Sequence, residues 1–147
     1  MKGTILQVSI SAGGIPKNAI PEATLAANGI VGDAWRYPFH GGPKRAILLI
    51  TAEGIETLIG QGFPVYRGAL GENLTTFGLD RFLLRLGQRF RAGQAIIQLT
   101  QVRVPCGTLS VYGAGIQAAM YDAGLSGFYA CVVEPGIVRP GDPIELL

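Results

Sequence analysis

The sequence has few charged residues and no large excess of either sign. Charged residues make up 15% of the 147 residues, and twelve Lys and Arg against ten Asp and Glu give a formal net charge of +2. Proteins that bind nucleic acids or membrane surfaces through their overall charge carry a much larger positive excess. We therefore expect no nucleic-acid partner and no membrane partner, and any anion site must be built from a few local cations.

Long hydrophobic runs are also missing. Apolar residues reach 48% of the chain, but their runs are short, as in AILLI at 46–50, whereas a membrane-spanning helix needs about 20 such residues. The first residues, MKGTILQVSIS, contain neither the apolar core nor the small-residue cleavage site of a secretory signal. These features predict a soluble protein located in the cytoplasm.

Cysteine and histidine are scarce. The chain has two cysteines, Cys106 and Cys131, and one histidine, His40. A reducing compartment and a chain long enough to fold without cross-links both disfavour a disulfide, so we expect two free thiols. One histidine and two cysteines also fall short of the four ligands of a structural zinc site.

Glycine and proline are abundant instead. Their 22 and 9 residues are spread along the chain, a pattern typical of many short segments separated by turns. The length fits a single domain over residues 1–147. Four segments are enriched in β-branched and aromatic residues and are predicted to be strands: 4–11, 46–50, 95–104 and 128–134.

Two further segments favour helices. Residues 51–62 begin with Thr51 as a candidate N-cap and end at a glycine, and residues 115–123 make a shorter case. Many strands with a few short helices inserted between them predict a mainly β fold, a closed or nearly closed barrel decorated by helices.

The apolar alternation changes phase inside the predicted strand 95–104. Apolar residues occupy odd positions up to Leu99 and even positions from Val102 onward. Such a change in a two-residue period is what a β-bulge produces, so we place a bulge between these two residues. Pro105 lacks an N–H group and ends strand pairing, which puts Cys106 where the chain leaves the sheet.

The residues around Cys106 leave its role open. A nearby cation and partial exposure would favour the thiolate and make it a nucleophile or a soft-metal ligand. Arg103 is the nearest cation, but strand alternation points it to the opposite face unless the break at Pro105 brings it round. The alternative is an inert apolar thiol, the usual fate of a free cysteine.

Three glycine-rich stretches offer polar and cationic groups. PFHGGPKRAI at 38–47 places two glycines and two cations after the histidine, which suits a phosphate or another anion. GALGENLTTFGLD at 68–80 presents Glu72, Asn73, Thr75 and Thr76, and GGIPK at 13–17 ends in Lys17. Taken alone, each stretch is also an ordinary turn. Neither a P-loop nor a dinucleotide fingerprint is present.

Taken together and in order, these stretches resemble the MOSC domain, the module named for the C-terminal part of molybdenum-cofactor sulfurase. The resemblance includes the motifs HGGPKRA, GENLT and RVPC and covers nearly the whole chain, in the segments 8–17, 29–35, 39–49, 68–80, 100–109 and 127–146. It implies a mainly β, barrel-like MOSC fold with a few short helices. It also implies binding of the molybdenum cofactor (molybdopterin), a pterin dithiolene that carries a phosphate.

The resemblance assigns roles to individual residues. In that family the cysteine of the RVPC stretch is the metal ligand or a sulfur carrier, a role that falls on Cys106, and a soft thiolate suits both tasks. For the phosphate we expect Lys17, His40, Lys44, Arg45 and Arg103, and for the polar edges of the pterin Asn73 and Thr75. Cys131 stands where relatives more often carry a cation, and we expect it to pack in the core as a strand residue.

Three functions follow from the resemblance. In the first, Cys106 holds the metal, and the protein reduces N-hydroxylated or N-oxygenated substrates with electrons from a separate protein, since this chain has no flavin or iron–sulfur module. In the second, Cys106 accepts a persulfide sulfur from a cysteine desulfurase, whose pyridoxal phosphate stays on that partner, and passes it to a metal–sulfur cluster or cofactor. In the third, the barrel is a binding scaffold without a cofactor. The sequence does not indicate the oligomeric state.

Overall fold

The computed structural model describes residues 1–35 and 41–147. Its helical segments are α1 (Ala52–Gly60), α2 (Ile116–Asp122) and the 3₁₀ turns η2 (Pro43–Arg45) and η3 (Gly107–Tyr112). Its strands are β1 (Lys2–Ile10), β2 (Asn18–Ile20), β3 (Ala23–Ala26), β4 (Gly29–Ile30), β5 (Ile47–Thr51), β6 (Leu74–Phe77), β7 (Arg89–Ala92), β8 (Ala95–Val102), β9 (Phe128–Glu134), β10 (Gly136–Val138) and β11 (Pro143–Leu146).

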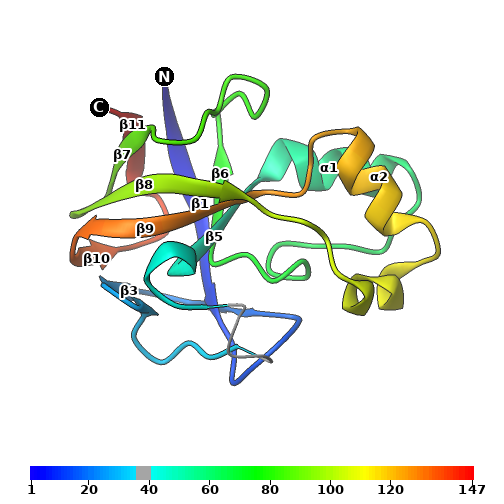
Figure 1. Cartoon of the computed structure of the whole chain (residues 1–147), viewed down its shortest axis with the longest axis horizontal. Helices are drawn as coiled ribbons and strands as arrows, with labels where there is room; N and C mark the ends of the chain where they lie inside the picture. The colour runs from blue at the N-terminus through cyan, green and yellow to red at the C-terminus, as the bar shows by residue number, and fades with distance from the viewer. Residues whose placement is uncertain (36–40) are drawn as a thin grey trace.

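Seven of these strands close into a barrel, in the order β11-β7-β8-β9-β5-β6-β1, and β11 pairs back with β1 (Figure 1). All neighbours in the barrel are antiparallel except β5 and β6, which are parallel. Parallel neighbours need a crossover connection, and α1 lies within it. β2 extends the sheet beyond β1, and β10, β3 and β4 form a second, small sheet. The predicted mainly β, barrel-like fold is confirmed.

Strand β5 explains how the barrel is joined to the rest of the molecule. Ile47 and Leu49 belong to the core inside the barrel, whereas Leu48 and Ile50 belong to a second apolar cluster on its outer face. Because successive side chains of a strand point to opposite faces, a strand covered on both faces is apolar throughout. This is why the run AILLI does not alternate.

The second apolar cluster lies under the helices. The predicted helix at 51–62 is confirmed as α1, and the Thr51 hydroxyl accepts a hydrogen bond from the Gly54 N–H at 3.2 Å, as an N-cap does. α1 and α2 lie together on one side of the barrel (Figure 1). Their buried side chains Leu58, Ile116 and Met120 pack into this cluster.

The predicted bulge is also confirmed. The register between β8 and β9 shifts between Leu99 and Gln101, where Leu99 pairs with Ala130 and Gln101 with Tyr129. Leu99 therefore stays in the core inside the barrel, while Gln101 lines a cavity on the outer face. β8 ends at Val102, just before Pro105.

The two cysteines are free thiols, as expected, but Cys131 is not in the core. It lies on β9 opposite Gln98 and is half-buried, because its neighbours Ala130 and Val132 take the inward-facing positions of the strand. The expectation of a core thiol was wrong, because the apolar run 128–134 does not by itself indicate which of its residues face the inside of the barrel.

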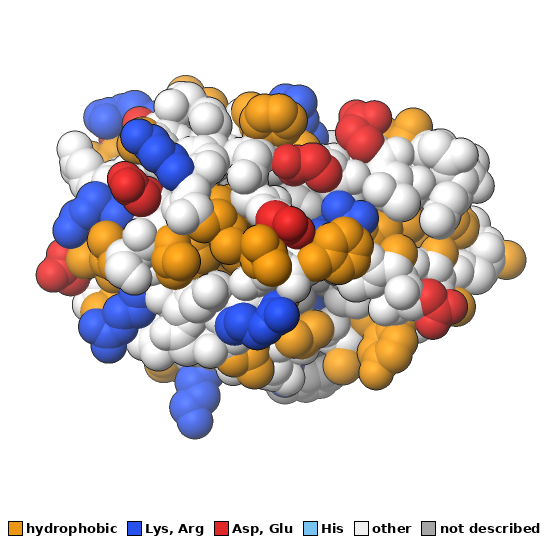
Figure 2. All heavy atoms as spheres, turned by 90° about the horizontal axis from the view of Figure 1, so that it is seen from above, with side chains coloured by type: hydrophobic (Ala, Val, Ile, Leu, Met, Phe, Trp, Pro, Cys, Tyr) orange, Lys and Arg blue, Asp and Glu red, His pale blue; other side chains and the backbone are white. Residues whose placement is uncertain are grey.

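The surface has no continuous band of one charge on the face that Figure 2 shows, where basic and acidic side chains are interspersed with apolar ones. Among the helices of residues 1–35 and 41–147, none has the length and apolar character needed to cross a membrane.

Candidate functional site

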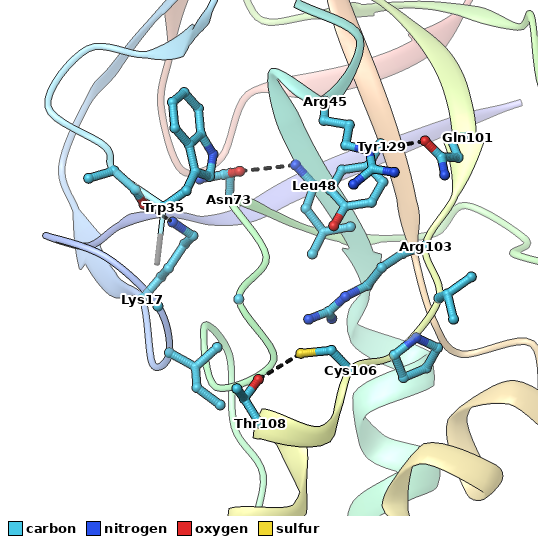
Figure 3. A pocket seen from close by; sticks show the side chains of 16 residues that line it. Lys17, Trp35, Arg45, Leu48, Asn73, Gln101, Arg103, Cys106, Thr108 and Tyr129 are labelled. Atoms are coloured by element: carbon cyan, nitrogen blue, oxygen red, sulfur yellow. Dashed lines mark hydrogen bonds between the residues drawn. The ribbon is translucent and has the colours of Figure 1, made fainter. Parts of the chain in front are cut away.

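A cavity of about 390 Å³ opens on the outer face of the barrel (Figure 3). This volume lies within the range of about 300–1,000 Å³ that is typical of small-molecule sites. Three cationic residues line it, and no described lining residue is acidic: the wall consists of Gly14, Ile15, Lys17, Ala34, Trp35, Arg45, Leu48, Gly71, Asn73, Gln101, Arg103, Val104, Pro105, Cys106, Thr108 and Tyr129. The cavity is therefore suited to an anionic ligand.

Cys106 lies at the start of η3, where the chain has just left the barrel, and its thiol is half-buried. The Sγ atom is 2.7 Å from the Thr108 hydroxyl oxygen. Partial burial raises the pKa of the thiol, but hydrogen bonds from the Thr108 side chain and backbone and the charge of Arg103 outweigh it, so the pKa lies below its ordinary value. The thiolate of Cys106 is favoured at its place in the cavity wall.

Arg103 lines the same cavity, although strand alternation alone pointed it away from Cys106. It follows the last residue of β8, where its backbone N–H still donates to the Gly127 carbonyl at 3.0 Å. Its side chain is 7% exposed, and Nη1 has no hydrogen-bond partner. Figure 3 shows the guanidinium turned toward the thiol. Burial lowers the pKa of Arg103, whereas Tyr129, Cys106 and Glu72 raise it, and an arginine remains a cation throughout.

Arg45 forms a second cationic part of the wall. Its Nε donates to the Gln101 side-chain oxygen at 3.1 Å, and its guanidinium carbon lies 5.1 Å from the centre of the Tyr129 ring. The ring and the amide hold this long side chain over the cavity through cation–π and hydrogen-bonding contacts. Sequence reasoning named Arg45 but missed Gln101 and Tyr129. The predicted bulge was the signal that Gln101 turns outward.

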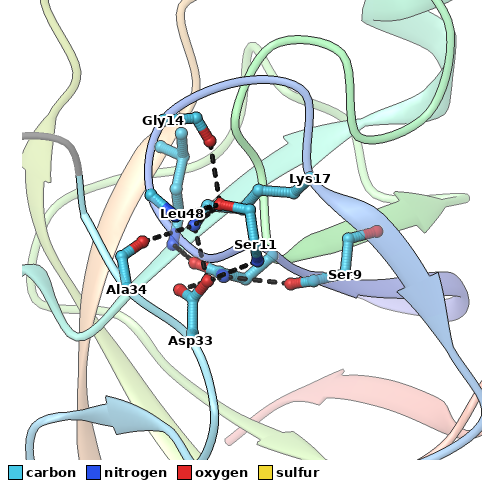
Figure 4. A network of polar contacts seen from close by, with 9 residues as sticks. Ser9, Ser11, Gly14, Lys17, Asp33, Ala34 and Leu48 are labelled. Atoms are coloured by element: carbon cyan, nitrogen blue, oxygen red, sulfur yellow. Dashed lines mark hydrogen bonds and ion pairs between the residues drawn. The ribbon is translucent and has the colours of Figure 1, made fainter.

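Lys17 lines the cavity but is engaged elsewhere (Figure 4). Its ammonium lies 2.6 Å from Asp33 Oδ1 and also donates to the Ala34 carbonyl at 3.2 Å and the Ser11 hydroxyl at 3.4 Å. Asp33 Oδ1 accepts a further bond from the Ser11 N–H. The pair therefore joins the loop after β1 to the loop after β4.

Asn73 has a similar supporting place. Its side-chain oxygen accepts from the Leu48 N–H at 2.9 Å, and its NH₂ group donates to the Ser9 carbonyl at 3.1 Å and to Asp33 Oδ2 at 2.9 Å. Asn73 borders the cavity, but these bonds use its amide to hold the wall together. Thr75 is fully buried outside the lining, and its hydroxyl donates to Glu72 Oε2 at 3.3 Å.

The described residues of the stretch 38–47 have different places: Arg45 lines the cavity and Lys44 lies on the surface. Lys44 is exposed on η2 and is not among the lining residues, and its carbonyl accepts a hydrogen bond from the Thr100 hydroxyl. His40 lies outside the described residues. Of the four cations and one histidine expected at the phosphate, the structure brings Lys17, Arg45 and Arg103 together around one cavity.

Trp35 is a further lining residue that sequence reasoning did not single out. It is the only tryptophan of the chain. Gly41 accommodates it, since a Cβ atom at Gly41 would overlap with the indole ring. The GGP stretch therefore makes room for an aromatic wall.

Comparison with known proteins agrees with this architecture. The model of the MOSC domain family matches residues 36–145. The chain belongs to the MOSC domain family. It is 36% identical to the uncharacterized protein YflK of Bacillus subtilis over 113 residues, 74% of this chain, and 34% identical to the protein YiiM of Escherichia coli over 134 residues, 86% of this chain.

A solved structure shares the fold. The crystal structure of YiiM from Escherichia coli superposes with a TM-score of 0.81 at 30% identity, covering 100% of this MOSC domain and 70% of the YiiM chain. The aligned parts make up 50% of YflK and 59% of YiiM, so this MOSC domain spans about half of the curated relatives.

MOSC domains are generally associated with binding of the molybdenum cofactor. The cavity fits such a group in three respects. It offers a soft thiolate, as a thiophilic metal prefers, a cationic wall without a described carboxylate, and a buried guanidinium whose Nη1 lacks a partner. A buried donor without a partner is costly, so a ligand that accepts its hydrogen bond is favoured.

Proposed function

We propose that this MOSC domain binds the molybdenum cofactor in the cavity, with the Cys106 thiolate as the protein ligand of the metal. The observation that carries the proposal is that a thiol with a lowered pKa and a buried cation with an unpartnered donor, Arg103, line one cavity. A metal ligand must be deprotonated, and Thr108 and Arg103 both favour the thiolate.

The other lining residues hold and orient the ligand. Arg45 and Arg103 supply charge and directed N–H donors for its phosphate, while Lys17 contributes positive charge that Asp33 partly offsets. Trp35 and Tyr129 supply an aromatic wall that limits the access of water and strengthens these electrostatic contacts.

When bound, the cofactor supplies two-electron oxygen-atom chemistry, and we propose N-hydroxylated or N-oxygenated compounds as the substrates. The protein supplies binding, orientation and electrostatics for that chemistry. For the electrons we propose a separate protein as the donor.

Molybdenum content tests this proposal. The wild type, Cys106→Ala and Cys131→Ala are expressed in a host that makes the cofactor and measured by elemental analysis. We expect close to one metal per chain in the wild type and in Cys131→Ala, and its loss in Cys106→Ala. Equal metal content in all three variants would overturn the ligand assignment, and no metal in any of them would overturn the cofactor proposal.

The same thiol supports a second function, sulfur transfer. A half-buried thiolate that faces an open cavity can accept a sulfane sulfur. In that step the Cys106 thiolate attacks the outer sulfur of a desulfurase persulfide, an S–S bond forms on Cys106, and the donor cysteine leaves as its thiolate. Mass spectrometry after incubation with a cysteine desulfurase and cysteine would then find one added sulfur on wild type and none on Cys106→Ala. If neither metal nor sulfur is found, the third function, a scaffold, remains.

A further inference from the structure

Behind the cavity wall lies a carboxyl group that the proposed function does not use. Glu72 is fully buried, and its two neighbours in the sequence, Gly71 and Asn73, line the cavity. Its Oε2 accepts from the Thr75 hydroxyl at 3.3 Å, but its Oε1 has no hydrogen-bond partner. Burial raises the pKa of Glu72, against the opposing effects of backbone N–H groups, Thr75 and the charge of Arg103. The ionised carboxylate is costly in such surroundings unless a cation compensates its charge.

Arg103 is that cation. Its Nη2 lies 3.7 Å from the position of a Cβ atom at Gly71, so the guanidinium packs against the backbone that leads into Glu72. Each residue favours the charged form of the other. They are not in direct contact as Lys17 and Asp33 are, and both keep one unpartnered polar atom.

The other groups near Glu72 do not compensate its charge. Tyr112 on η3 interacts with it, but burial, with contributions from Tyr66 and Glu72, raises the pKa of Tyr112 to about 12, so this phenol is neutral. Thr75 offers a neutral hydroxyl. Arg103 therefore interacts electrostatically with both Glu72 and Cys106, and it favours the charged form of both.

We propose that Glu72 is the counterion that sets how strongly Arg103 attracts an anionic group beside Cys106. A carboxylate close to the guanidinium cancels part of its field in the cavity, and removing that charge leaves the field uncompensated. The ligand class is an anion, such as a phosphate-bearing cofactor, so the inference rests on the proposed function for its biological meaning. In this proposal Glu72 does not touch the ligand. It acts through the charge of Arg103 and is therefore a positioning residue.

Two alkylating reagents measure this field without any cofactor. Iodoacetate is an anion and iodoacetamide is neutral, and both displace iodide by attack of the same thiolate. The ratio of their rate constants at Cys106 therefore reports the local positive potential and cancels the thiolate fraction. The full chain is used in a Cys131→Ser background, so that Cys106 is the only thiol, and the adduct is followed by intact-protein mass spectrometry.

The variants separate charge from shape. Glu72→Gln keeps the size and removes the charge, and we expect the iodoacetate to iodoacetamide ratio to rise about three- to tenfold. Glu72→Asp keeps the charge and should leave the ratio near that of the wild type. Arg103→Met removes the cation and should lower the ratio by a similar factor. Glu53→Gln is the matched control, because Glu53 also has one unpartnered oxygen but lies on α1, away from the cavity lining.

A ratio that stays the same or falls in Glu72→Gln overturns the proposal, as does an unchanged ratio in Arg103→Met. Should Glu72→Gln fail to fold, the double variant Glu72→Gln/Arg103→Met decides the question. A counterion pair predicts that the double variant regains the fold that the single variant loses, and a double variant that is no better overturns the pairing. These measurements need no metal. They can therefore overturn the counterion proposal while Cys106 still binds molybdenum, or support it when Cys106 binds no metal.

Discussion

Two buried pairs of opposite charge border the cavity, and they are built differently. In Lys17 and Asp33 the ammonium touches the carboxylate at 2.6 Å, and both carboxylate oxygens accept further hydrogen bonds. In Glu72 and Arg103 there is no such contact, and Oε1 and Nη1 have no partner. A fully satisfied pair holds the fold, whereas a pair with unused donors keeps hydrogen-bonding capacity for a ligand.

The largest expected effect breaks the satisfied pair. Lys17→Met leaves Asp33 buried without its cation, and removing one partner of a buried pair costs about 3–5 kcal/mol of the free energy of unfolding. Urea unfolding measures this loss. Lys44→Met, on the exposed surface of η2, serves as the control and should change stability by about 0.5 kcal/mol or less. Equal effects of the two substitutions would show that Lys17 is not a structural cation.

Arg103→Met is expected to destabilise less but to affect binding more. The pKa of Glu72 is already raised by burial, so the carboxylate that loses its cation can take up a proton, and we expect a loss of about 1–2 kcal/mol. Molybdenum content, measured on the same preparation, should fall well below that of the wild type. A stability loss larger than that of Lys17→Met, or an unchanged metal content, would remove the contrast between the two pairs.

The next effect is expected at Thr108, whose hydroxyl favours the Cys106 thiolate. Thr108→Val removes the hydroxyl that lies 2.7 Å from the sulfur, so the pKa of Cys106 should rise. Because only the thiolate reacts, alkylation by iodoacetamide at neutral pH should slow about three- to tenfold and its pH profile should move to higher pH. Thr57→Val, which removes a hydroxyl that donates to the Glu53 carbonyl on α1, should leave both unchanged. A profile that does not move would mean that Thr108 does not stabilise the thiolate.

The smallest effect is expected at the second thiol. Cys131 is half-buried on β9 and does not line the cavity, so Cys131→Ser should change the free energy of unfolding by about 0.5 kcal/mol or less. Its molybdenum content should equal that of the wild type. Unfolding and elemental analysis together check this, and a drop in metal content would show that the cavity residues alone do not account for binding.

Much of the secondary structure could be predicted from local sequence patterns. Four strands and both helices were predicted near their observed bounds, because β-branched enrichment, the Thr51 cap and the glycines act over short distances along the chain. The bulge in β8 was predicted for the same reason. The short strands such as β2, β3 and β10 were not, since a strand of three or four residues owes its existence to its partner across the sheet and has little pattern of its own.

The candidate site was predictable in part. Cys106, Arg45 and Arg103 were expected and line one cavity. Thr75 and Lys44 were expected beside the ligand, yet one is buried behind the wall and the other is exposed. Trp35 and Tyr129 were missed because nothing in the sequence indicates that the loop after β4 approaches the outer face of β9, whereas the predicted bulge was an available signal for Gln101.

The mainly β character of the chain, the end of β8 before Cys106 and the membership of the MOSC domain family follow from local patterns, because alternation, proline and motif order are properties of the chain as it is written. The pairing of the charged side chains depends instead on how the chain folds in three dimensions. Lys17 pairs with Asp33, and Arg103 interacts electrostatically with both Cys106 and Glu72. Electrostatic and hydrogen-bonding energies depend on distances across the folded chain and on burial. Neither quantity can be predicted from the spacing of residues along the sequence.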